Sequence, residues 1–396
     1  MKTLNIGHNY FIVGGSDRVL IETVKLMSSH GHTAIPFCCA DEKNLPSEYS
    51  KYFPSSISTD GSNPLDIIQY FYNHDAVVKL EYLLDEHPEI EIAHLHIYYG
   101  KITTSVLKVL KKRNIKIVQS LHEYKLVCPV YTMQRDGDVC DKCLDGSFYN
   151  CIRYRCKDNS FIKSSIVTLE SYFSRYMGDV TLIDKFISVS HFHRTIMIKG
   201  GVPDSKISVL HNFVDTNVVT KTLKHKGYFL YFGRIEKLKG IDTLIEAFKQ
   251  SHHRLIIVGD GSYVENMKSK IEHLDNIEYA GFQEGDVLAT TIRNCVAVIV
   301  PSEWYENCPM NVLEAKAYGK PVLGCDIGGI PELVDDGKDG YIIPVRDSEA
   351  LVNKLDYLVR DYESLASQSL DNCVINFSDT AHYNKLMAIY DSLLKF

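Results

Sequence analysis

The sequence lacks the long hydrophobic runs that membrane-spanning and exported chains carry. No window reaches about 18 uninterrupted apolar residues, and the chain enters its first expected strand at Leu4 without a signal-like apolar core. A helix that spans a bilayer needs about 20 consecutive apolar residues, so neither a membrane span nor export is indicated. We therefore expect a cytoplasmic protein.

An excess of positive charge is also absent. The chain has 43 Lys and Arg against 50 Asp and Glu, a formal net charge of −7, so the whole molecule is not expected to bind nucleic acid. A local basic cluster ends a predicted helix at residues 103–113. Two interpretations stay open, a solvated helix end and contact with an anionic membrane surface. The cluster consists of Lys108, Lys111, Lys112, Arg113 and Lys116.

The length and composition are those of a two-domain globular protein. The 396 residues exceed one ordinary core and fit two domains of about 200 residues each. Apolar residues make up 45% of the chain and charged residues 23%. Eleven cysteines in a chain expected to be cytoplasmic indicate thiols or metal ligands rather than disulfides.

The first half of the chain alternates expected strands with expected helices. Strands are predicted at residues 3–9, 32–38, 90–97 and 115–120, which indicates a parallel sheet in a Rossmann-like domain. Gly14 and Gly15 lie between the first strand and its helix. Glycine lets backbone N–H groups approach a diphosphate closely, although Gly-Gly before a helix is also common in plain turns.

Two histidines fall at the carboxyl ends of expected strands, where ligands of parallel sheets bind. These are His96 and His122, the latter within SLHEYKLVCP. His122 is the candidate for ligand contact. The alternative is a hydrogen-bonded residue of the wall.

Residues 125–178 depart from the strand and helix alternation and are interpreted as an insertion. The Cys-x2-Cys pair within it can place two thiolates on one zinc ion, so reduced structural thiols and a structural zinc site both stay open, with an iron–sulfur cluster as a third alternative. The proposed zinc ligands are Cys128, Cys140, Cys143 and Cys156, and Cys151 is the fifth cysteine of the segment. Asp136-Gly137-Asp138 could be taken for a metal-binding Asp-x-Asp motif, but Asp-Gly predicts a turn.

The second half brings two cations close together in YFGRIEKLKG. Arg234, next to Gly233, and Lys239 follow one expected strand, so they can converge on one diphosphate from the end of that strand. Ordinary surface ion pairs are the alternative.

Residues 300–332 carry the most specific pattern. A strand ends near Pro301, and a helix is expected from about Pro309 to Tyr318, so that the N–H groups of Met310 and Asn311 are available to an anion. Glu306 precedes this helix and Glu314 lies within it. At 1.5 Å per helical residue the two carboxylates are about 8 Å apart, a distance that suits two ends of one nucleotide sugar.

The spacing Glu-x7-Glu followed by AKAYGKPVLGCDIGGIPELV resembles the donor-site signature of family 4 retaining glycosyltransferases. The resemblance covers nearly the whole chain, is strongest over residues 227–345 and weakest over 128–178. It implies the GT-B fold, in which two Rossmann-like parallel-sheet domains face each other across a cleft. The expected boundaries are 1–216 for an acceptor domain, 227–380 for a nucleotide-sugar domain, and 381–396 for a helix that packs back on the first.

The resemblance also implies roles for the residues named above. Arg234 and Lys239 would stabilise the leaving diphosphate without a catalytic metal, Glu306 would hold sugar hydroxyls and Glu314 the ribose. His122 would approach the donor sugar. A UDP-sugar is favoured over a GDP-sugar. Backbone groups expected to line the donor belong to Gly14, Gly15, Gly233, Met310 and Asn311.

The expected reaction is retaining hexosyl transfer from a nucleotide sugar to a hydroxyl of a glycan or polyprenyl-diphosphate-linked glycan, in cell-surface polysaccharide biosynthesis. Front-face substitution is the expected mechanism because no carboxylate stands out as a nucleophile. The enzyme would be cytoplasmic or peripheral at the cytoplasmic face of the membrane. The alternatives are a GT-B epimerase or phosphorylase, and a non-catalytic sugar-nucleotide-binding scaffold. Asn307-Cys308-Pro309 replaces the Gly and Phe of many relatives, so sugar selectivity is not inferred.

Overall fold

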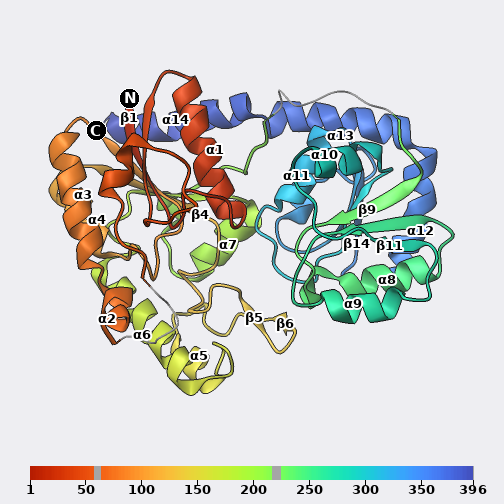
Figure 1. Cartoon of the computed structure of the whole chain (residues 1–396), viewed down its shortest axis with the longest axis horizontal. Coiled ribbons are helices and arrows are strands. Elements are labelled where there is room, and N and C mark those ends of the chain that lie inside the picture. Colours follow the sequence, from red (N-terminus) through yellow and green to blue (C-terminus); the bar gives the residue numbers. More distant parts are fainter. Residues whose placement is uncertain (58–63, 216–223, 396) are drawn as a thin grey trace. The chain divides into compact units, whose positions relative to one another are not determined.

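The computed structural model describes residues 1–57, 64–215 and 224–395. These residues form two compact units (Figure 1). The first comprises Met1–Met133, Asp141–Leu210 and Tyr383–Phe396, and the second comprises Gln134–Cys140 and His211–His382. Most of the domain boundary predicted at 217–226 lies outside the described residues.

The first unit contains a six-stranded parallel sheet in the order β2-β1-β3-β4-β7-β8. Its strands are almost fully buried, as expected for a parallel sheet. The parallel sheet predicted from the alternation of strands and helices is therefore confirmed. The strands are β1 (Lys2–Ile6), β2 (Thr33–Phe37), β3 (Ile92–Leu95), β4 (Lys116–Leu121), β7 (Lys185–Ser188) and β8 (Ile207–Val209).

The helices of the first unit connect these strands and extend into the insertion. They include α14, whose Leu386 and Tyr390 are fully buried in the core of this unit, where the Tyr390 hydroxyl lies 2.7 Å from His94 Nδ1. The helices are α1 (Gly15–Ser29), η1 (Glu48–Tyr52), α2 (Pro64–Phe71), α3 (His74–Glu86), α4 (Ser105–Lys112), α5 (Tyr149–Arg153), α6 (Phe161–Met177), α7 (His191–Lys199), η2 (Asp204–Lys206) and α14 (Asp379–Leu394).

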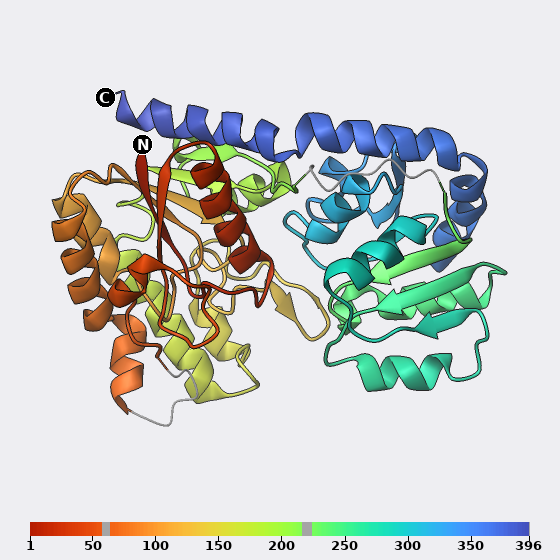
Figure 2. The same cartoon turned by 45° about the horizontal axis from the view of Figure 1, so that its top comes forward.

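The second unit contains another six-stranded parallel sheet, in the order β11-β10-β9-β12-β13-β14. The strands of this sheet are drawn in green to blue in Figure 2. Its central strands are fully buried. The strands are β9 (Tyr228–Phe232), β10 (Arg254–Val258), β11 (Ile277–Tyr279), β12 (Val298–Val300), β13 (Val322–Cys325) and β14 (Gly340–Ile343).

The helices of this unit agree with the sequence pattern in the region that matters most. The helix expected from about Pro309 to Tyr318 is observed as α11 (Met310–Ala317), with Pro309 as its N-cap and Gly319 in the left-handed region (φ +64°) after its end. The others are η4 (Lys237–Lys239), α8 (Ile241–Lys249), α9 (Val264–Ile271), α10 (Gly285–Asn294), η5 (Ile330–Glu332), α12 (Ser348–Arg360) and α13 (Tyr362–Asn376).

A two-residue turn connects β5 (Gln134–Arg135) to β6 (Asp138–Val139), and the two strands form an antiparallel hairpin. Its turn residues Asp136 and Gly137 both have positive φ, 55° and 84°, which matches the hairpin turn that Asp-Gly favours. The turn predicted at this position is confirmed. Asp138 accepts a hydrogen bond from Arg346 Nη2 at 2.6 Å, so the hairpin is not arranged as a metal-binding Asp-x-Asp motif.

A buried ion pair holds α11 to the loop before β14. Lys316 Nζ lies 2.5 Å from Asp339 Oδ2, and both side chains are at most 1% exposed. Asp339 also accepts hydrogen bonds from the Asn372 side chain and the Asp335 backbone. Burial lowers the pKa of Lys316, while the charge of Asp339 opposes that shift. Removing Asp339 would therefore leave the buried Lys316 ammonium, the Asn372 amide and the Asp335 N–H group without their shared acceptor.

We expect Asp339→Ala to destabilise the second unit by about 3–5 kcal/mol, because it leaves the Lys316 ammonium buried without its counter-charge. Urea unfolding followed by the emission of Trp304, the single tryptophan of the chain, measures this unit alone. Lys338→Ala is the matched control, since Lys338 forms an exposed pair with Asp335 in the same segment and should change stability by less than about 1 kcal/mol. Equal effects of the two substitutions would contradict the role of the buried pair.

Candidate donor-binding site

Three adjacent strands of the second unit end at the same edge of its sheet. Strands β9, β12 and β13 are neighbours in a parallel sheet, so the segments that follow them meet there. The segment after β9 carries Arg234 and Lys239, the segment after β12 carries Glu306, and the segment after β13 carries Gly328. The structure therefore gathers the predicted cations and the first acid of the Glu-x7-Glu motif.

Glu306 is the best-fixed side chain at this edge. It is 8% exposed, and its Oε1 lies 2.5 Å from Lys239 Nζ and 2.8 Å from the Ser302 hydroxyl that donates to it. Burial alone would raise the pKa of Glu306, but Lys239 and the hydrogen bonds outweigh burial and lower that pKa. Glu306 is therefore ionised at neutral pH and neutralises Lys239 locally.

Arg234 is the cation that stays available. Its side chain is exposed, and among the residues that the structure describes no carboxylate pairs with it. The guanidinium carbon lies 5.6 Å from the Trp304 ring centroid, and Lys239 Nζ lies 4.6 Å from the same centroid. Both distances are in the range of cation–π contacts, so one indole positions both cations.

Close backbone contacts at glycines fix the shape of the edge. A Cβ on Gly328 (φ +63°) would lie 2.3 Å from the Glu306 carbonyl oxygen, and Gly329 N donates to that oxygen at 2.7 Å. A Cβ on Gly240 (φ +76°) would lie 1.9 Å from the Pro301 oxygen. Only glycine permits such approaches together with a positive φ. The loop that carries Glu306 therefore packs directly against the backbone at Gly328, and the loop that carries Lys239 packs against the backbone of Pro301.

The start of α11 lies at the end of β9. Asn311 Nδ2 donates to the Phe232 carbonyl oxygen at 3.2 Å. The Asn311 Oδ1 atom is buried and has no hydrogen-bond partner in the described part of the chain. Met310, Asn311 and Glu314 are each partly exposed. A free amide oxygen beside a helix N-terminus is suited to a ligand that offers both anionic oxygens and hydroxyl groups.

His122 in the first unit lies directly after β4, as expected. Its Nε2 is 2.9 Å from Nδ1 of His96, which follows β3, and the two rings stack 5° from parallel. Burial lowers the pKa of His122 to about 4, so this imidazole is neutral at pH 7. It can exchange hydrogen bonds with a ligand but does not contribute a positive charge.

The loop of Gly14 and Gly15 is arranged differently from a simple phosphate cradle. Gly14 is the N-cap of α1 and Gly15 its first residue, and both are exposed. The Asp17 carboxylate accepts hydrogen bonds from the Val13 and Gly14 N–H groups at 3.3 and 3.2 Å. A phosphate would have to compete with Asp17 for these donors. Diphosphate binding by this loop stays a prediction.

Comparisons with known proteins follow the same division of the chain. The model described as "Glycosyltransferase Family 4" matches residues 13–218, more than half of the chain, and that described as "Glycosyl transferases group 1" matches residues 216–370. The chain belongs to glycosyltransferase family 4. The family predicted from the sequence pattern is therefore confirmed.

Two relatives and one solved structure illustrate the range of similarity. The transferase is 24% identical over 374 residues to N-acetyl-alpha-D-glucosaminyl L-malate synthase of Bacillus anthracis, covering 89% of this chain and 87% of that protein. It is 28% identical over 222 residues to the putative colanic acid biosynthesis glycosyltransferase WcaL of Salmonella typhimurium, covering 52% of this chain and 55% of that protein. The chain spans about half the length of several relatives.

The solved structure is that of Anabaena HepE in complex with UDP-glucose. It aligns over 99% of this chain and all of that chain, with a TM-score of 0.69 and 19% identity. Together with the two parallel-sheet units, this similarity establishes the GT-B fold for the transferase. The fold class expected from the sequence is confirmed.

The cysteines of the transferase do not gather into a possible zinc site. All eleven are free thiols, and within residues 1–57, 64–215 and 224–395 no three cysteine sulfurs lie within 4.8 Å of one another. The arrangement thus does not support a zinc site made by Cys128, Cys140, Cys143 and Cys156. Cys151, left out of that set, is the closer partner of Cys156: a hydrogen bond from the Cys156 thiol lowers the pKa of Cys151 to about 7.

Two members of the basic cluster are already paired. Lys111 Nζ lies 2.5 Å from Asp184 and Arg113 Nη2 lies 2.5 Å from Asp85. These ion pairs favour the interpretation of a structured helix end over that of a membrane-binding patch. Over the residues that the structure describes, no helix combines the length and apolarity needed to cross a bilayer.

Two residues of the donor edge in the second unit, and one residue beside His122 in the first unit, were not singled out by the sequence pattern. Trp304 and Gly328 lie inside the recognised stretch, but their contacts depend on how β9, β12 and β13 are ordered. Glu123 follows His122 directly, and burial raises its pKa to about 7, although Lys125 opposes the shift. A carboxyl group with this pKa can hold or release a proton near neutral pH. Only its position next to His122 could have indicated it.

We expect Gly328→Ala to destabilise the second unit by about 1–3 kcal/mol more than Gly337→Ala, because its Cβ would overlap the Glu306 backbone. Gly337 is the matched control: it has a similar φ of +76°, but nothing lies within 4 Å of its added Cβ. The measurement is urea unfolding followed by Trp304 emission. If the two substitutions have equal effects, Gly328 does not fix the Glu306 loop.

Proposed function

We propose that the enzyme transfers a sugar, with retention of configuration, from a UDP-sugar bound to its second unit onto a hydroxyl of a glycan acceptor. The observation that carries this proposal is Arg234, an exposed guanidinium without a carboxylate partner in the described residues, beside Lys239 at the carboxyl ends of β9 and β12. The name of the HepE structure, a complex with UDP-glucose, supports a uridine nucleotide as the donor.

In this proposal the two cations stabilise the departing diphosphate. Arg234 presents a planar fork of N–H donors that matches phosphate oxygens, and Lys239 adds a point charge. Donors fixed in advance toward a developing negative charge are among the strongest contributions to catalysis. A divalent metal is not required for this role, and activity should survive chelation of metal ions.

The acids take the hydroxyl groups of the donor. Glu306 is ionised and fixed near Lys239, so it can accept hydrogen bonds from the transferred sugar, while Glu314, farther along α11, holds the ribose. The N–H groups of Met310 and Asn311 face the phosphate or the sugar. In the first unit, neutral His122 serves as a hydrogen-bonding group toward the sugar. Reaction on the front face, with the leaving phosphate assisting deprotonation of the acceptor, suits a site without a placed carboxylate nucleophile.

We infer that the acceptor is an intermediate of cell-surface polysaccharide biosynthesis attached to a polyprenyl diphosphate. The name of the WcaL relative refers to colanic acid biosynthesis, which supports the pathway class. The first unit offers a surface with the matching chemistry on α6. Four exposed apolar side chains recur along one face of this helix at seven-, three- and four-residue intervals, namely Ile162, Leu169, Tyr172 and Tyr176.

Two exposed arginines lie at the end of the helix that packs against α6. Helix α5 packs against α6 and ends at the exposed Arg153, two residues before Arg155. Neither arginine has a carboxylate partner within the described residues. An exposed apolar stripe, together with exposed guanidinium groups at the end of the neighbouring helix, suits an anionic lipid carrier at a membrane surface. The enzyme would then be peripheral at the cytoplasmic face.

The donor site is tested by titration of UDP against the emission of Trp304. We expect Arg234→Ala to raise the dissociation constant of UDP by about 10-fold or more and to lower turnover by about 100-fold, because a charged donor at a developing charge is lost. Lys237→Ala is the matched control, since Lys237 is an exposed lysine two residues before Lys239. Wild-type affinity and turnover in Arg234→Ala would overturn the site.

The same kinetic assay separates the two acids. Glu306→Gln should lower mainly kcat, since the charge is lost beside the reacting sugar, whereas Glu314→Gln should raise mainly KM. Release of free nucleotide only when the acceptor is present distinguishes transfer from the epimerase and phosphorylase alternatives. No change of either kinetic constant in Glu314→Gln would leave Glu314 a structural residue of α11.

The acceptor surface is tested by sedimentation with phosphatidylglycerol vesicles that contain polyprenyl phosphate. We expect Ile162→Asp to reduce the bound fraction several-fold, because it places a carboxylate in the apolar stripe. Ile375→Asp is the matched control, since Ile375 is 69% exposed against 70% for Ile162 but lies on α13 of the second unit. Equal binding of both variants and wild type would show that α6 does not contact the membrane.

A further inference from the structure

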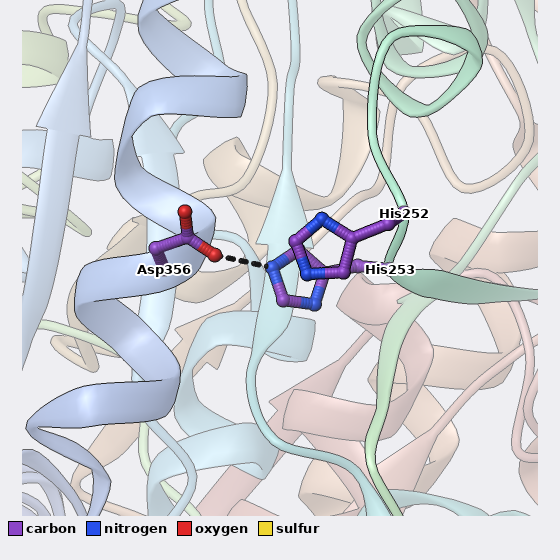
Figure 3. A group of neighbouring side chains, drawn as sticks. All are labelled: His252, His253 and Asp356. Carbon is purple, nitrogen blue, oxygen red and sulfur yellow. Dashed lines mark hydrogen bonds and ion pairs between the residues drawn. The ribbon is translucent and has the colours of Figure 1, made fainter.

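The second unit contains a cluster of two histidines and one aspartate on the surface (Figure 3). His252 and His253 lie between α8 and β10, and Asp356 lies on α12. One ligand atom of each residue lies within 4.8 Å of the others, which holds for no other group of three His, Cys, Asp or Glu residues in the described part of the chain. The cluster is at the amino end of β10, whereas Arg234 and Glu306 follow carboxyl ends of strands.

One of the three residues, His253, is held in place by its surroundings. His253 Nε2 lies 2.8 Å from Asp356 Oδ1. The Phe229 ring contacts the His253 ring edge to face, with centroids 5.2 Å apart. Asn276 Nδ2 donates to the Ser251 and His253 carbonyl oxygens at 3.1 and 3.0 Å, which fixes the backbone that carries both histidines. The His253 side chain and the backbone that carries both histidines are therefore fixed by neighbouring residues.

His252 is the residue that an ordinary ion pair does not require. Its side chain is exposed, and its ring centroid lies 4.1 Å from that of His253. A bond between His253 and Asp356 explains two of the three residues. The His252 imidazole lies beside that of His253 and has a nitrogen within 4.8 Å of the Asp356 carboxylate. His252 therefore adds a third possible metal ligand to the pair.

We propose that His252, His253 and Asp356 bind a divalent transition-metal ion of the zinc type. Imidazole nitrogen and carboxylate oxygen are ligands that Zn²⁺ takes at about 2.0–2.2 Å, and three protein ligands leave a fourth position for water. Ligand atoms of a tetrahedral zinc ion are roughly 3.4 Å apart at such bond lengths. The exposed side chains of His252 and Asp356 can turn by the small amount this needs, while the less exposed His253 stays nearly in place.

The ion would join the segment before β10 to α12. These segments are more than 100 residues apart in sequence, since His253 and Asp356 are separated by 103 positions. Because the complete ligand set exists only in the folded unit, a bound ion stabilises that unit. This site is independent of the donor site and of the proposed transfer reaction.

The test is calorimetric titration of the fully reduced protein with zinc chloride, together with thermal unfolding followed by Trp304 emission with and without zinc. The variants are His252→Ala, which spares the bond between His253 and Asp356, and Asp356→Asn. His273→Ala is the matched control because it removes an exposed histidine elsewhere in the same unit. Melting without zinc confirms that each variant is folded.

We expect one zinc ion per chain to be lost, or bound at least about 10-fold more weakly, in His252→Ala and in Asp356→Asn. Binding in His273→Ala should equal that of the wild type. The rise of the melting temperature with zinc should disappear in the same two variants. Zinc that binds to cysteine thiols would bind equally to all variants, so it would not produce this difference. Unchanged zinc binding in His252→Ala, or equal weakening in His273→Ala, would overturn the site.

Discussion

The desolvated ion pair between Lys239 and Glu306 is the constraint on which the donor edge depends. Removing a carboxylate from water is costly unless a counter-charge and hydrogen bonds replace the lost solvation, and Lys239 and Ser302 provide both for Glu306. The pair joins the segment after β9 to the segment after β12. Any change that moves either segment leaves one buried charge without its partner, so the two loops keep one relative position.

Glycine makes this position attainable. The carbonyl group of Glu306 lies against Gly328 and that of Pro301 against Gly240, at distances that no Cβ atom would permit. These close contacts leave the two loops little room to move, and the ring of the single tryptophan, Trp304, lies within cation–π distance of Arg234 and Lys239. The ion pair, the close glycine contacts and the Trp304 ring thus each restrict the positions of the charged groups at the donor edge.

The sequence predicts the elements well and their side-chain partners less well. Pro309 and Gly319 bound α11 because proline and glycine act locally, and the parallel sheets follow from the order of strands and helices. The pairing of Lys239 with Glu306 depends on β9 lying beside β12, which local patterns do not encode. Cysteine spacing likewise leaves the positions of sulfur atoms open, and His253 meets Asp356 across 103 residues.

The electrostatics of the donor edge follow from which charges are already satisfied. Arg234 and Lys239 contribute two positive charges and Glu306 one negative charge, so these three groups carry a net charge of +1. The neutralised pair is mostly withdrawn from solvent, with the Lys239 side chain 18% exposed and that of Glu306 10%, whereas the remaining charge resides on the exposed Arg234. An approaching anion therefore meets first the group with the most N–H donors and the least desolvation to overcome. The aromatic face of Trp304 holds that group without neutralising it, which a carboxylate could not do.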